Sequence, residues 1–272
     1  MENIVKGIVA GAVTLGGLYV LSTQGRTGHP GLAQLQSFKY AHRGLHDTEK
    51  PENSMAAFRA ALENGYGIEL DVHLLADGNL AVIHDSTLKR VTGAEGIVED
   101  LTTEDLKNYR LCGTEETIPT FRELLDLYEG KAPLIVELKP VKGNHDALTA
   151  RAVEMLENWN GLYCMESFDP RCIYWLKKNR PDICRGQLSG NHFESKDKMS
   201  LWLKFVLTWH MVNFLILPDF IAYRFADRKN IGNFLVRRFW GIQGVSWTLR
   251  NWEEYNAAVR EGWIPIFENI KP

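Results

Sequence analysis

Eight short apolar segments, separated by helical patterns, run through the chain between residues 37 and 268. Such alternation is typical of an α/β protein with a parallel sheet, and eight units predict a closed (β/α)₈ TIM-type barrel. An extra strand, 80–85, follows the second barrel strand after a hairpin turn at Asp77-Gly78. The predicted barrel strands are 37–43, 67–73, 133–139, 162–168, 183–189, 219–224, 243–249 and 263–268.

The intervals between these strands carry apolar residues at helical spacing. Asn53 or Ser54 is a suitable N-cap for the first helix. The apolar spacing predicts no eighth helix after the last strand. We therefore expect residues 31–35 or the N-terminal segment to cover the side of the barrel that this helix would otherwise cover. The predicted helices are 54–64, 120–129, 145–159, 170–179, 199–214, 230–240 and 251–261.

Three short polar groups of residues lie at or near the ends of the early strands. His42-Arg43-Gly44 ends the first strand, Glu69-Leu70-Asp71 lies late in the second, and His84-Asp85 ends the hairpin strand. Because side chains on a strand alternate, Glu69 and Asp71 share one face and can share one hard cation. Arginine suits an anion and imidazoles move protons. Together they indicate phosphate chemistry at the carboxyl rim of the barrel, where such folds place their active sites.

The third strand carries a similar pair. Glu137 and Lys139 follow the apolar run Leu134-Ile-Val136 and share the same parity, which brings a third carboxylate and an ammonium to the rim. The alternative is an exposed strand with a simple ion pair. The apolar residues that precede the pair favour the inward orientation.

The order and spacing of these motifs resemble the glycerophosphodiester phosphodiesterase family, over roughly residues 38 to 270. One difference lies at the end of the eighth strand, where many members carry an aspartate-containing loop and this chain has Glu268-Asn269. The matching segments are Ala41-His-Arg-Gly44, Pro51-Glu-Asn-Ser54, Glu69-Leu-Asp71, Asp77-Gly78, His84-Asp85, Ile118-Pro119, Leu134-Ile-Val-Glu-Leu-Lys139, Ser167-Phe168 and Val245-Ser-Trp-Thr248.

The resemblance implies metal-dependent hydrolysis of glycerophosphodiesters to sn-glycerol 3-phosphate and an alcohol. It implies that Glu69, Asp71 and Glu137 bind one divalent cation, which the oxygen ligands suggest is Ca²⁺ or Mg²⁺. His42 and His84 would form the general acid and base pair, with neither role assigned to either residue. In the family, the neighbouring hydroxyl of the glycerol attacks the phosphorus, and water then opens the cyclic phosphate.

Four residues are the candidates for holding the substrate. Arg43 and Lys139 would bind the phosphoryl oxygens. Trp247 matches the family position that packs against the glycerol, and Phe168 is a second candidate contact. For Phe168 a place in the core is at least as plausible, because aromatic residues near strand ends usually fill barrels.

Two other functions compete with this interpretation. A lysophospholipase D-like enzyme would hydrolyse lipids that keep one acyl chain, which an association with membranes would suit. A non-catalytic protein that binds lipid head groups is disfavoured, because both histidines and all three acids are present.

Charge and cysteine content narrow the choice of partners. The 31 basic and 34 acidic residues give a net charge of −3, which argues against nucleic acid. Nothing in the sequence indicates a protein partner. Cys112, Cys164, Cys172 and Cys184 lack metal-ligand spacing and are typical of buried apolar positions, which favours a reducing compartment. Their even number leaves disulfide pairing as the alternative.

The N-terminus predicts a membrane association. We divide the chain into a membrane anchor at 1–24, a linker at 25–36 and the barrel domain at 37–272. The apolar segment from about Ile4 to Ser22 is marginally long enough for a single-pass helix. A signal peptide is the alternative, although no Ala-x-Ala cleavage site follows. The charges around the segment give no orientation, and the cysteines favour a barrel on the cytoplasmic face.

A second apolar segment, 201–217, ends at Pro218 and is too short and polar to span a membrane well. It is either a helix packed on the barrel or an element that rests in the lipid interface through Trp202 and Trp209.

Overall fold

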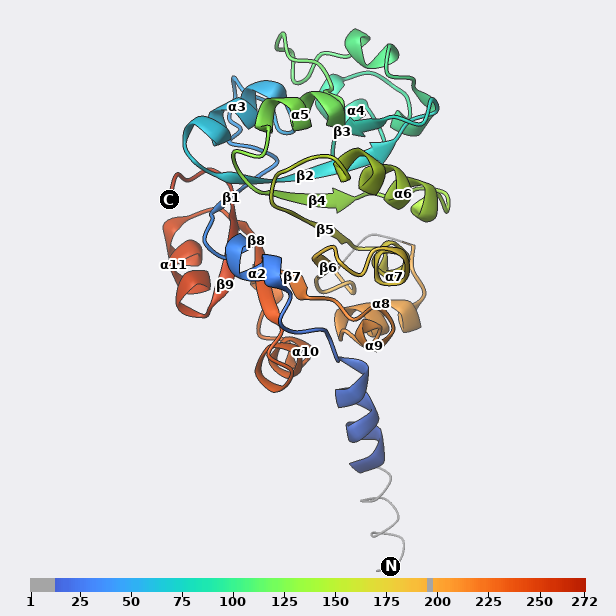
Figure 1. Cartoon of the computed structure of the whole chain (residues 1–272), viewed down its shortest axis with the longest axis vertical. Coiled ribbons are helices and arrows are strands. Elements are labelled where there is room, and N and C mark those ends of the chain that lie inside the picture. The colour runs from blue at the N-terminus through green and yellow to red at the C-terminus, as the bar shows by residue number, and fades with distance from the viewer. Residues whose placement is uncertain (1–12, 195–197) are drawn as a thin grey trace, which may run out of the picture.

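The computed structural model describes residues 13–194 and 198–272. Eight parallel strands form a closed barrel, because β1 pairs with both β2 and β9, and a further strand, β3 (Leu80–Val82), pairs antiparallel with β2. The predicted TIM-type barrel with an extra hairpin strand is therefore confirmed (Figure 1). The barrel strands are β1 (Tyr40–His42), β2 (Gly67–Leu74), β4 (Leu134–Leu138), β5 (Tyr163–Ser167), β6 (Arg185–Ser189), β7 (Phe220–Arg224), β8 (Gln243–Leu249) and β9 (Trp263–Phe267).

Five of the predicted helices form where expected, with local capping that explains their starts. Ser54 accepts a hydrogen bond from the Ala57 amide, and Thr120 and Glu123 form a reciprocal capping box. Short helices follow the hairpin strand: α4 (Lys89–Thr92), η1 (Val98–Asp100) and η2 (Asp105–Asn108). The five helices are α3 (Met55–Glu63), α5 (Phe121–Tyr128), α6 (His145–Leu156), α7 (Pro170–Asn179) and α11 (Trp252–Arg260).

The prediction of one helix over 199–214 is wrong. The structure has α8 (Leu201–Thr208) and α9 (Asn213–Ile216), with His210 between them at a φ of 58°. Tyr223 Oη and Asn230 Nδ2 donate to the Thr208 carbonyl at 3.1 and 3.2 Å, so side chains satisfy a group that a continuing helix would have used.

The predicted helix 230–240 is also divided, into α10 (Ile231–Phe234) and a π-helical turn, η4 (Leu235–Phe239). A 3₁₀ turn, η3 (Phe225–Asp227), precedes them directly after β7. The widening from α-helical to π-helical hydrogen bonding within ten residues could not be inferred from the apolar spacing.

The barrel interior is apolar at the amino end of the strands. Inward side chains from successive strands form one buried cluster there, and Leu35 of the short helix α2 (Pro30–Leu35) belongs to it. Helix α2 thus closes the amino end of the barrel, whereas we expected this segment to cover a flank. The inward members are Tyr40, Ile135, Cys164, Cys184, Phe220, Val245 and Ile264. The same inward positions, continued to the carboxyl ends, carry the polar residues of the site.

The N-terminal helix projects away from the barrel and is held at its end by side-chain contacts (Figure 1). Residues 13–22 are helical; Tyr19 Oη donates to the Trp209 carbonyl at 3.3 Å, and Trp240 Nε1 donates to the Val20 carbonyl at 3.0 Å. Arg26, in the segment predicted as a linker, forms a bidentate pair with Asp219 at 2.6 Å.

Within the described residues, no helix has the length and apolar character needed to cross a membrane. The predicted span from Ile4 to Ser22 lies partly outside them, since the description begins at residue 13. The anchor therefore stays a prediction.

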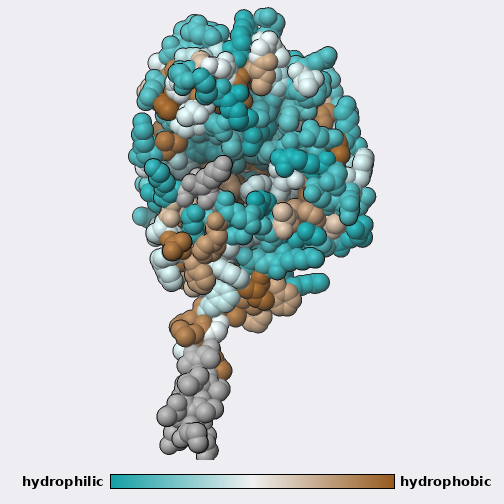
Figure 2. Space-filling model, turned by 180° about the vertical axis from the view of Figure 1, so that it is seen from behind, coloured by the Kyte–Doolittle hydropathy of each residue, from teal (hydrophilic) through white to brown (hydrophobic). Residues whose placement is uncertain are grey.

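Segment 201–217 combines features of both interpretations. Leu207 and Ile216 are buried against the barrel, whereas Leu201 and Trp202 are 75% and 67% exposed. Apolar side chains gather where the N-terminal helix meets the barrel (Figure 2). The exposed ones in this region include Leu18, Leu21, Phe214, Phe234 and Phe239.

Candidate active site

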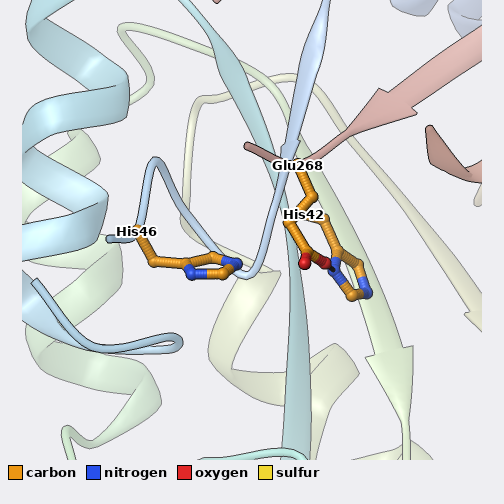
Figure 3. A group of neighbouring side chains, drawn as sticks. All are labelled: His42, His46 and Glu268. Atoms are coloured by element: carbon orange, nitrogen blue, oxygen red, sulfur yellow. Dashed lines mark hydrogen bonds and ion pairs between the residues drawn. The ribbon is translucent and has the colours of Figure 1, made fainter. Parts of the chain in front are cut away.

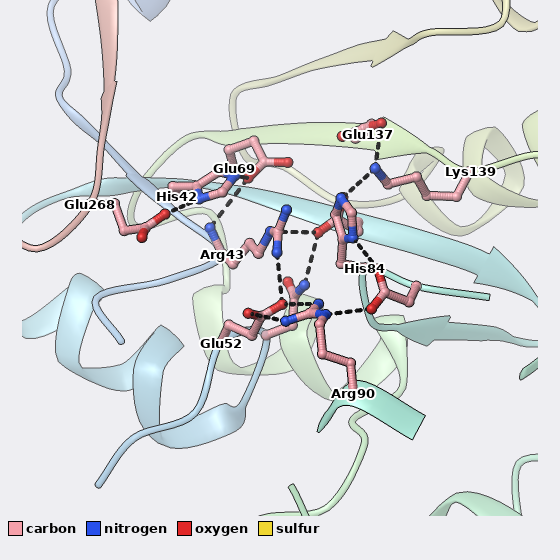
Figure 4. A network of polar contacts seen from close by, with 12 residues as sticks. His42, Arg43, Glu52, Glu69, His84, Arg90, Glu137, Lys139 and Glu268 are labelled. Atoms are coloured by element: carbon pink, nitrogen blue, oxygen red, sulfur yellow. Dashed lines mark hydrogen bonds and ion pairs between the residues drawn. The ribbon is translucent and has the colours of Figure 1, made fainter. Parts of the chain in front are cut away.

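Four inward side chains from three neighbouring strands meet at the carboxyl end of the barrel. His42 of β1 lies in register with Glu69 of β2, and Asp71 of β2 lies in register with Glu137 of β4. All four are buried. A cavity of about 370 Å³ opens beside them, and His84 from the hairpin side also lines it. Five of the predicted site residues are therefore brought together at one rim (Figure 4).

Three carboxylates form the deepest part of the site. One oxygen from each of Glu69, Asp71 and Glu137 lies within 4.8 Å of the others. Burial raises the pKa of Glu69 well above its usual value, and the charges of Asp71 and Glu137 raise it further. Burial also raises the pKa of Glu137, to about 7, although Lys139 opposes this. Three mutually repelling buried acids fit a site for a divalent cation, whose charge would relieve the repulsion.

Two positively charged side chains, Lys139 and Arg43, border this carboxylate cluster. Lys139 Nζ lies 3.0 Å from Asp71 Oδ1 and 2.7 Å from Glu137 Oε1. Arg43 Nε lies 3.4 Å from Asp71 Oδ2, and its backbone amide donates to the Glu69 carboxylate at 3.2 Å. Burial raises the pKa of Asp71, but Lys139, His84 and Arg43 together hold that pKa well below its ordinary value. Arg43 lines the same cavity as the carboxylates, whereas Lys139 lines a neighbouring cavity that also reaches His84 and Glu137, and a role of either residue in binding phosphate stays a prediction.

His42 is held by a carboxylate from the other end of the chain. Its Nδ1 lies 2.8 Å from Glu268 Oε2, and its Nε2 lies 3.8 Å from Glu69 Oε2. Burial lowers the pKa of His42, and the Glu268 hydrogen bond partly opposes this. Burial raises the pKa of Glu268, but the hydrogen bonds and charges of His42 and Arg250 together outweigh burial and hold that pKa at about 2. His46 lies beside this pair (Figure 3).

His84 has a carboxylate partner of its own. Its Nδ1 lies 2.6 Å from Oδ1 of the adjacent Asp85, whose Oδ2 lies 2.5 Å from Arg90 Nε. Arg90 also binds Glu52 at 2.7 Å, and Glu52 binds Arg43 at 2.8 Å. Burial is the main reason that the pKa of His84 falls to about 4. This chain of ion pairs connects the hairpin side of the site to the end of β1.

Two aromatic side chains form the wall of the cavity. Phe168 and Trp247 meet edge to face with their centroids 5.6 Å apart, and both line the cavity while packing on the interior cluster. Phe168 therefore packs on the core and also lines the cavity, and its contact with the substrate stays a prediction. Trp247 Nε1 is buried and has no hydrogen-bond partner among the described residues, which makes it a donor available to a ligand.

Glu166 is a further site residue, which was not predicted from the sequence. This residue lies on β5 in register with Glu137, is buried and lines the cavity. Burial, then the charge of Glu137, raises its pKa well above the ordinary value. Its Oε2 has no hydrogen-bond partner within the described residues. The inward parity of Glu166 within strand Tyr163–Ser167 was the available signal.

The glycerophosphoryl diester phosphodiesterase family matches residues 42–269. The chain belongs to this family. The match confirms the predicted resemblance and, with it, the enzyme class of a phosphoric diester hydrolase. All of the predicted site residues fall inside the matched segment or at its first position.

Curated relatives of the family extend over most of the chain. The glycerophosphodiester phosphodiesterase of Caldanaerobacter subterraneus subsp. tengcongensis is 29% identical over 241 residues, covering 84% of this chain and 92% of the relative. Glycerophosphodiester phosphodiesterase 1 of Bos taurus is 32% identical over 245 residues, covering 79% and 72%.

Solved structures share the fold. A phosphodiesterase of Oleispira antarctica, in complex with its product sn-glycerol-3-phosphate, superposes with a TM-score of 0.70 at 22% identity, covering 89% of this chain and 95% of that one. A family structure from Silicibacter pomeroyi gives a TM-score of 0.72 at 20% identity, covering 89% and 94%.

Proposed function

We propose that this chain hydrolyses glycerophosphodiesters to sn-glycerol 3-phosphate and an alcohol, with the help of a divalent cation. The observation that carries the proposal is the meeting, in one cavity, of two imidazoles that each have a carboxylate partner with three buried carboxylates. Family membership and a product-bound fold relative support the substrate class.

Glu69, Asp71 and Glu137 are the residues that would hold the cation. Their oxygens are the ligands that Ca²⁺ and Mg²⁺ prefer, and the cluster holds no thiolate. When bound, the cation supplies a Lewis acid that polarises a phosphoryl oxygen. Arg43 and Lys139 bind the remaining oxygens and offset the charge that builds on the phosphorus.

His42 and His84 move the protons at their Nε2 atoms. In each residue Nδ1 is engaged by a carboxylate, which holds a ring proton on Nδ1, so Nε2 accepts a proton when the ring is neutral and donates one when the ring is protonated. One imidazole takes the proton of the attacking hydroxyl as its oxygen bonds to phosphorus. The other enters the reaction protonated and gives its Nε2 proton to the alcohol oxygen as the bond between that oxygen and phosphorus breaks. In the second step water opens the cyclic phosphate and the two imidazoles exchange roles. The imidazole that gave its proton now takes one from the attacking water, and the other returns a proton to the glycerol hydroxyl.

Phe168 and Trp247 bind the glycerol portion of the substrate. Their edge-to-face arrangement presents an apolar surface beside the carboxylates, and the Trp247 indole N–H can donate to a hydroxyl. These contacts orient the neighbouring hydroxyl toward the phosphorus.

A substrate panel tests the proposal. Glycerophosphocholine and glycerophosphoethanolamine are assayed after EDTA treatment and after add-back of Ca²⁺ or Mg²⁺, with release of glycerol 3-phosphate as the readout. Activity that is lost with EDTA and restored by one cation is the expected result. Undiminished activity in EDTA, or no turnover of either diester with added cations, would contradict it.

We also propose that the N-terminal segment anchors the barrel to a membrane, with the barrel on the cytoplasmic side. Val13 and Leu15 are each 70% exposed on the projecting helix, and the four cysteines are free, in keeping with a reducing compartment. The test is flotation of the full chain with liposomes beside a variant that lacks residues 1–24. Equal flotation of the two proteins would contradict an anchor in this segment.

A further inference from the structure

A third side chain reaches the His42–Glu268 pair from the loop between β1 and α3. His46 lies in this loop, is half-buried and directs its ring toward the pair (Figure 3). One donor atom from each of the three residues lies within 4.8 Å of the others. The Nε2 atom of His46 is buried and has no hydrogen-bond partner among the described residues. We call His42, His46 and Glu268 the histidine trio; neither the proposed cation site nor the proton transfers use His46.

The donor atoms of the histidine trio differ from those of the carboxylate cluster. The cluster offers only oxygens, which suit Ca²⁺ and Mg²⁺. The trio offers two imidazole nitrogens and one carboxylate, a set that binds Zn²⁺. Donors that share one Zn²⁺ at roughly 2.0 to 2.2 Å lie about 3.5 Å apart, so a side-chain shift of about 1 Å brings the trio to this spacing. The two neighbouring groups therefore favour different metal ions.

The carboxylate of the trio is already oriented by its neighbours. Glu268 Oε2 lies 2.8 Å from His42 Nδ1, and Arg250 donates to Oε1 at 3.2 Å and to Oε2 at 3.3 Å. Hydrogen bonds of this kind hold a ligating carboxylate in place. The Arg250 side chain is 56% exposed, so it can turn into water when a cation takes over one of these oxygens.

We propose that the histidine trio binds a Zn²⁺ ion, separate from the cation at the carboxylate cluster, and that this ion inhibits the enzyme. Zn²⁺ takes the Nδ1 atom of His42 that now faces Glu268. The proton on Nδ1 leaves to water, and Nε2 takes up one proton from water, so the ring stays neutral. A ring in this state has no nitrogen lone pair at which to accept a proton.

The inhibition rests on the proposed function, because it acts through His42. In that function the two imidazoles exchange roles between the two steps. His42 must therefore accept a proton in one step, whichever role it takes first. Zn²⁺ on Nδ1 prevents that transfer and stops the cycle, while the carboxylate cluster and its cation stay in place.

A binding titration tests the site without turnover. The full chain is titrated with ZnCl₂ against a chromophoric zinc chelator, with Mg²⁺ in excess to fill the carboxylate cluster. His46→Gln removes one donor of the trio. The matched control is His145→Gln, because the His145 side chain is 21% exposed and lies at the start of α6, outside the trio. We expect one zinc ion per chain in the wild type and in His145→Gln that is absent from His46→Gln.

Inhibition is measured on the same three proteins, through kcat for glycerophosphocholine with increasing ZnCl₂. Without zinc, His46→Gln should keep the wild-type kcat, since His46 takes no part in the chemistry. The zinc concentration that halves kcat should rise at least roughly tenfold in His46→Gln, because one ligand is lost, and should stay unchanged in His145→Gln. Additional Mg²⁺ should not relieve the inhibition.

The outcomes separate this inference from the proposed function. Equal zinc sensitivity of the wild type and His46→Gln, or relief by Mg²⁺, would overturn the site, since zinc would then act at the carboxylate cluster. Zinc bound through His46 without a fall in kcat would overturn the inhibition and leave the proposed function standing. Absence of turnover for every diester would overturn the proposed function, and the titration would still decide whether the trio binds zinc.

A measurement on the wild type covers the case in which His46→Gln fails to fold. Nitrogen NMR spectra of the histidine rings are recorded with Mg²⁺ present, before and after addition of ZnCl₂. Zinc at the trio should shift the ring signals of His42 and His46. Unchanged signals from both rings would overturn the site.

Discussion

The two imidazole–carboxylate pairs of the site are built in different ways. The barrel pair, His42–Glu268, joins residues 226 positions apart, with side chains only 11% and 14% exposed. The hairpin pair, His84–Asp85, joins adjacent residues that are 31% and 25% exposed. The barrel pair exists only when β1 meets β9, whereas the hairpin pair forms from local geometry. The active site therefore requires barrel closure on one side and only a correctly positioned loop on the other.

A series of ion pairs connects the more exposed hairpin pair to the barrel. Arg90 joins Asp85 to Glu52, and Glu52 binds Arg43 at the end of β1. The hairpin pair is thus tied to the same strand that carries the barrel pair. We expect the two pairs to contribute equally to the chemistry and unequally to stability.

Removing either imidazole should have the largest effect. His42→Ala and His84→Ala should each lower kcat for glycerophosphocholine by on the order of 10² to 10⁴, because each removes one proton-transfer group. Steady-state assays with circular dichroism as a folding control measure this. If either variant keeps more than a tenth of wild-type kcat, the two pairs do not contribute equally to the chemistry.

A change in the carboxylate cluster should act through the cation instead. Glu69→Gln should weaken cation affinity by at least roughly tenfold, since one charged ligand is lost, and added cation should restore part of the activity. Titration of activity with Ca²⁺ or Mg²⁺ gives the apparent affinity. His84→Ala is the control, and rescue of that variant by excess cation would argue against a separate role for the imidazole.

The carboxylate partners should be visible in the pH profile. The Glu268 hydrogen bond raises the pKa of His42, so Glu268→Gln should lower that pKa further. Whether His42 acts as acid or as base, its limb of the kcat/KM profile then moves to lower pH, by about one pH unit. Asp85→Asn should move the His84 limb in the same direction but less, because Asp85 also serves Arg90. Profiles identical to wild type would show that neither partner tunes its imidazole.

The smallest effect is expected at Arg90. Its side chain is 45% exposed, so its ion pairs contribute about 1 kcal/mol or less, and Arg90→Ala should lower kcat/KM by less than roughly tenfold. Lys89→Ala, which removes the exposed pair with Glu95, is the matched control and should change nothing. A larger loss in Arg90→Ala would show that the action of the hairpin pair depends strongly on this link.

Much of this architecture could be predicted because it depends on short-range patterns. The period of two in Glu69-Leu70-Asp71 fixes a common inward face, and the apolar segments fix eight strands. Strand β8 was predicted with its observed bounds, and β9 to within one residue. His84 and Asp85 are neighbours, so their proximity required no knowledge of the fold.

The rest depends on long-range contacts. The predicted strand 162–168 contained Glu166, but its importance appears only once β5 lies beside β4. Glu268 was noted at the end of the eighth predicted strand, yet its bond to His42 requires the pairing of β1 with β9. The break after α8 depends on the hydrogen bonds that Tyr223 and Asn230 donate to the Thr208 carbonyl. The spacing of apolar residues along a helix contains no information about such contacts.

The central claim is that the two pairs, of unlike construction, act as one unit on one phosphorus. The double variant His42→Ala/His84→Ala tests it most directly, through kcat for glycerophosphocholine beside the two single variants. Groups that act together lose their contribution when either is removed, so the double variant should be about as active as the worse single variant. Losses that multiply would contradict the claim and would show that the two imidazoles work independently.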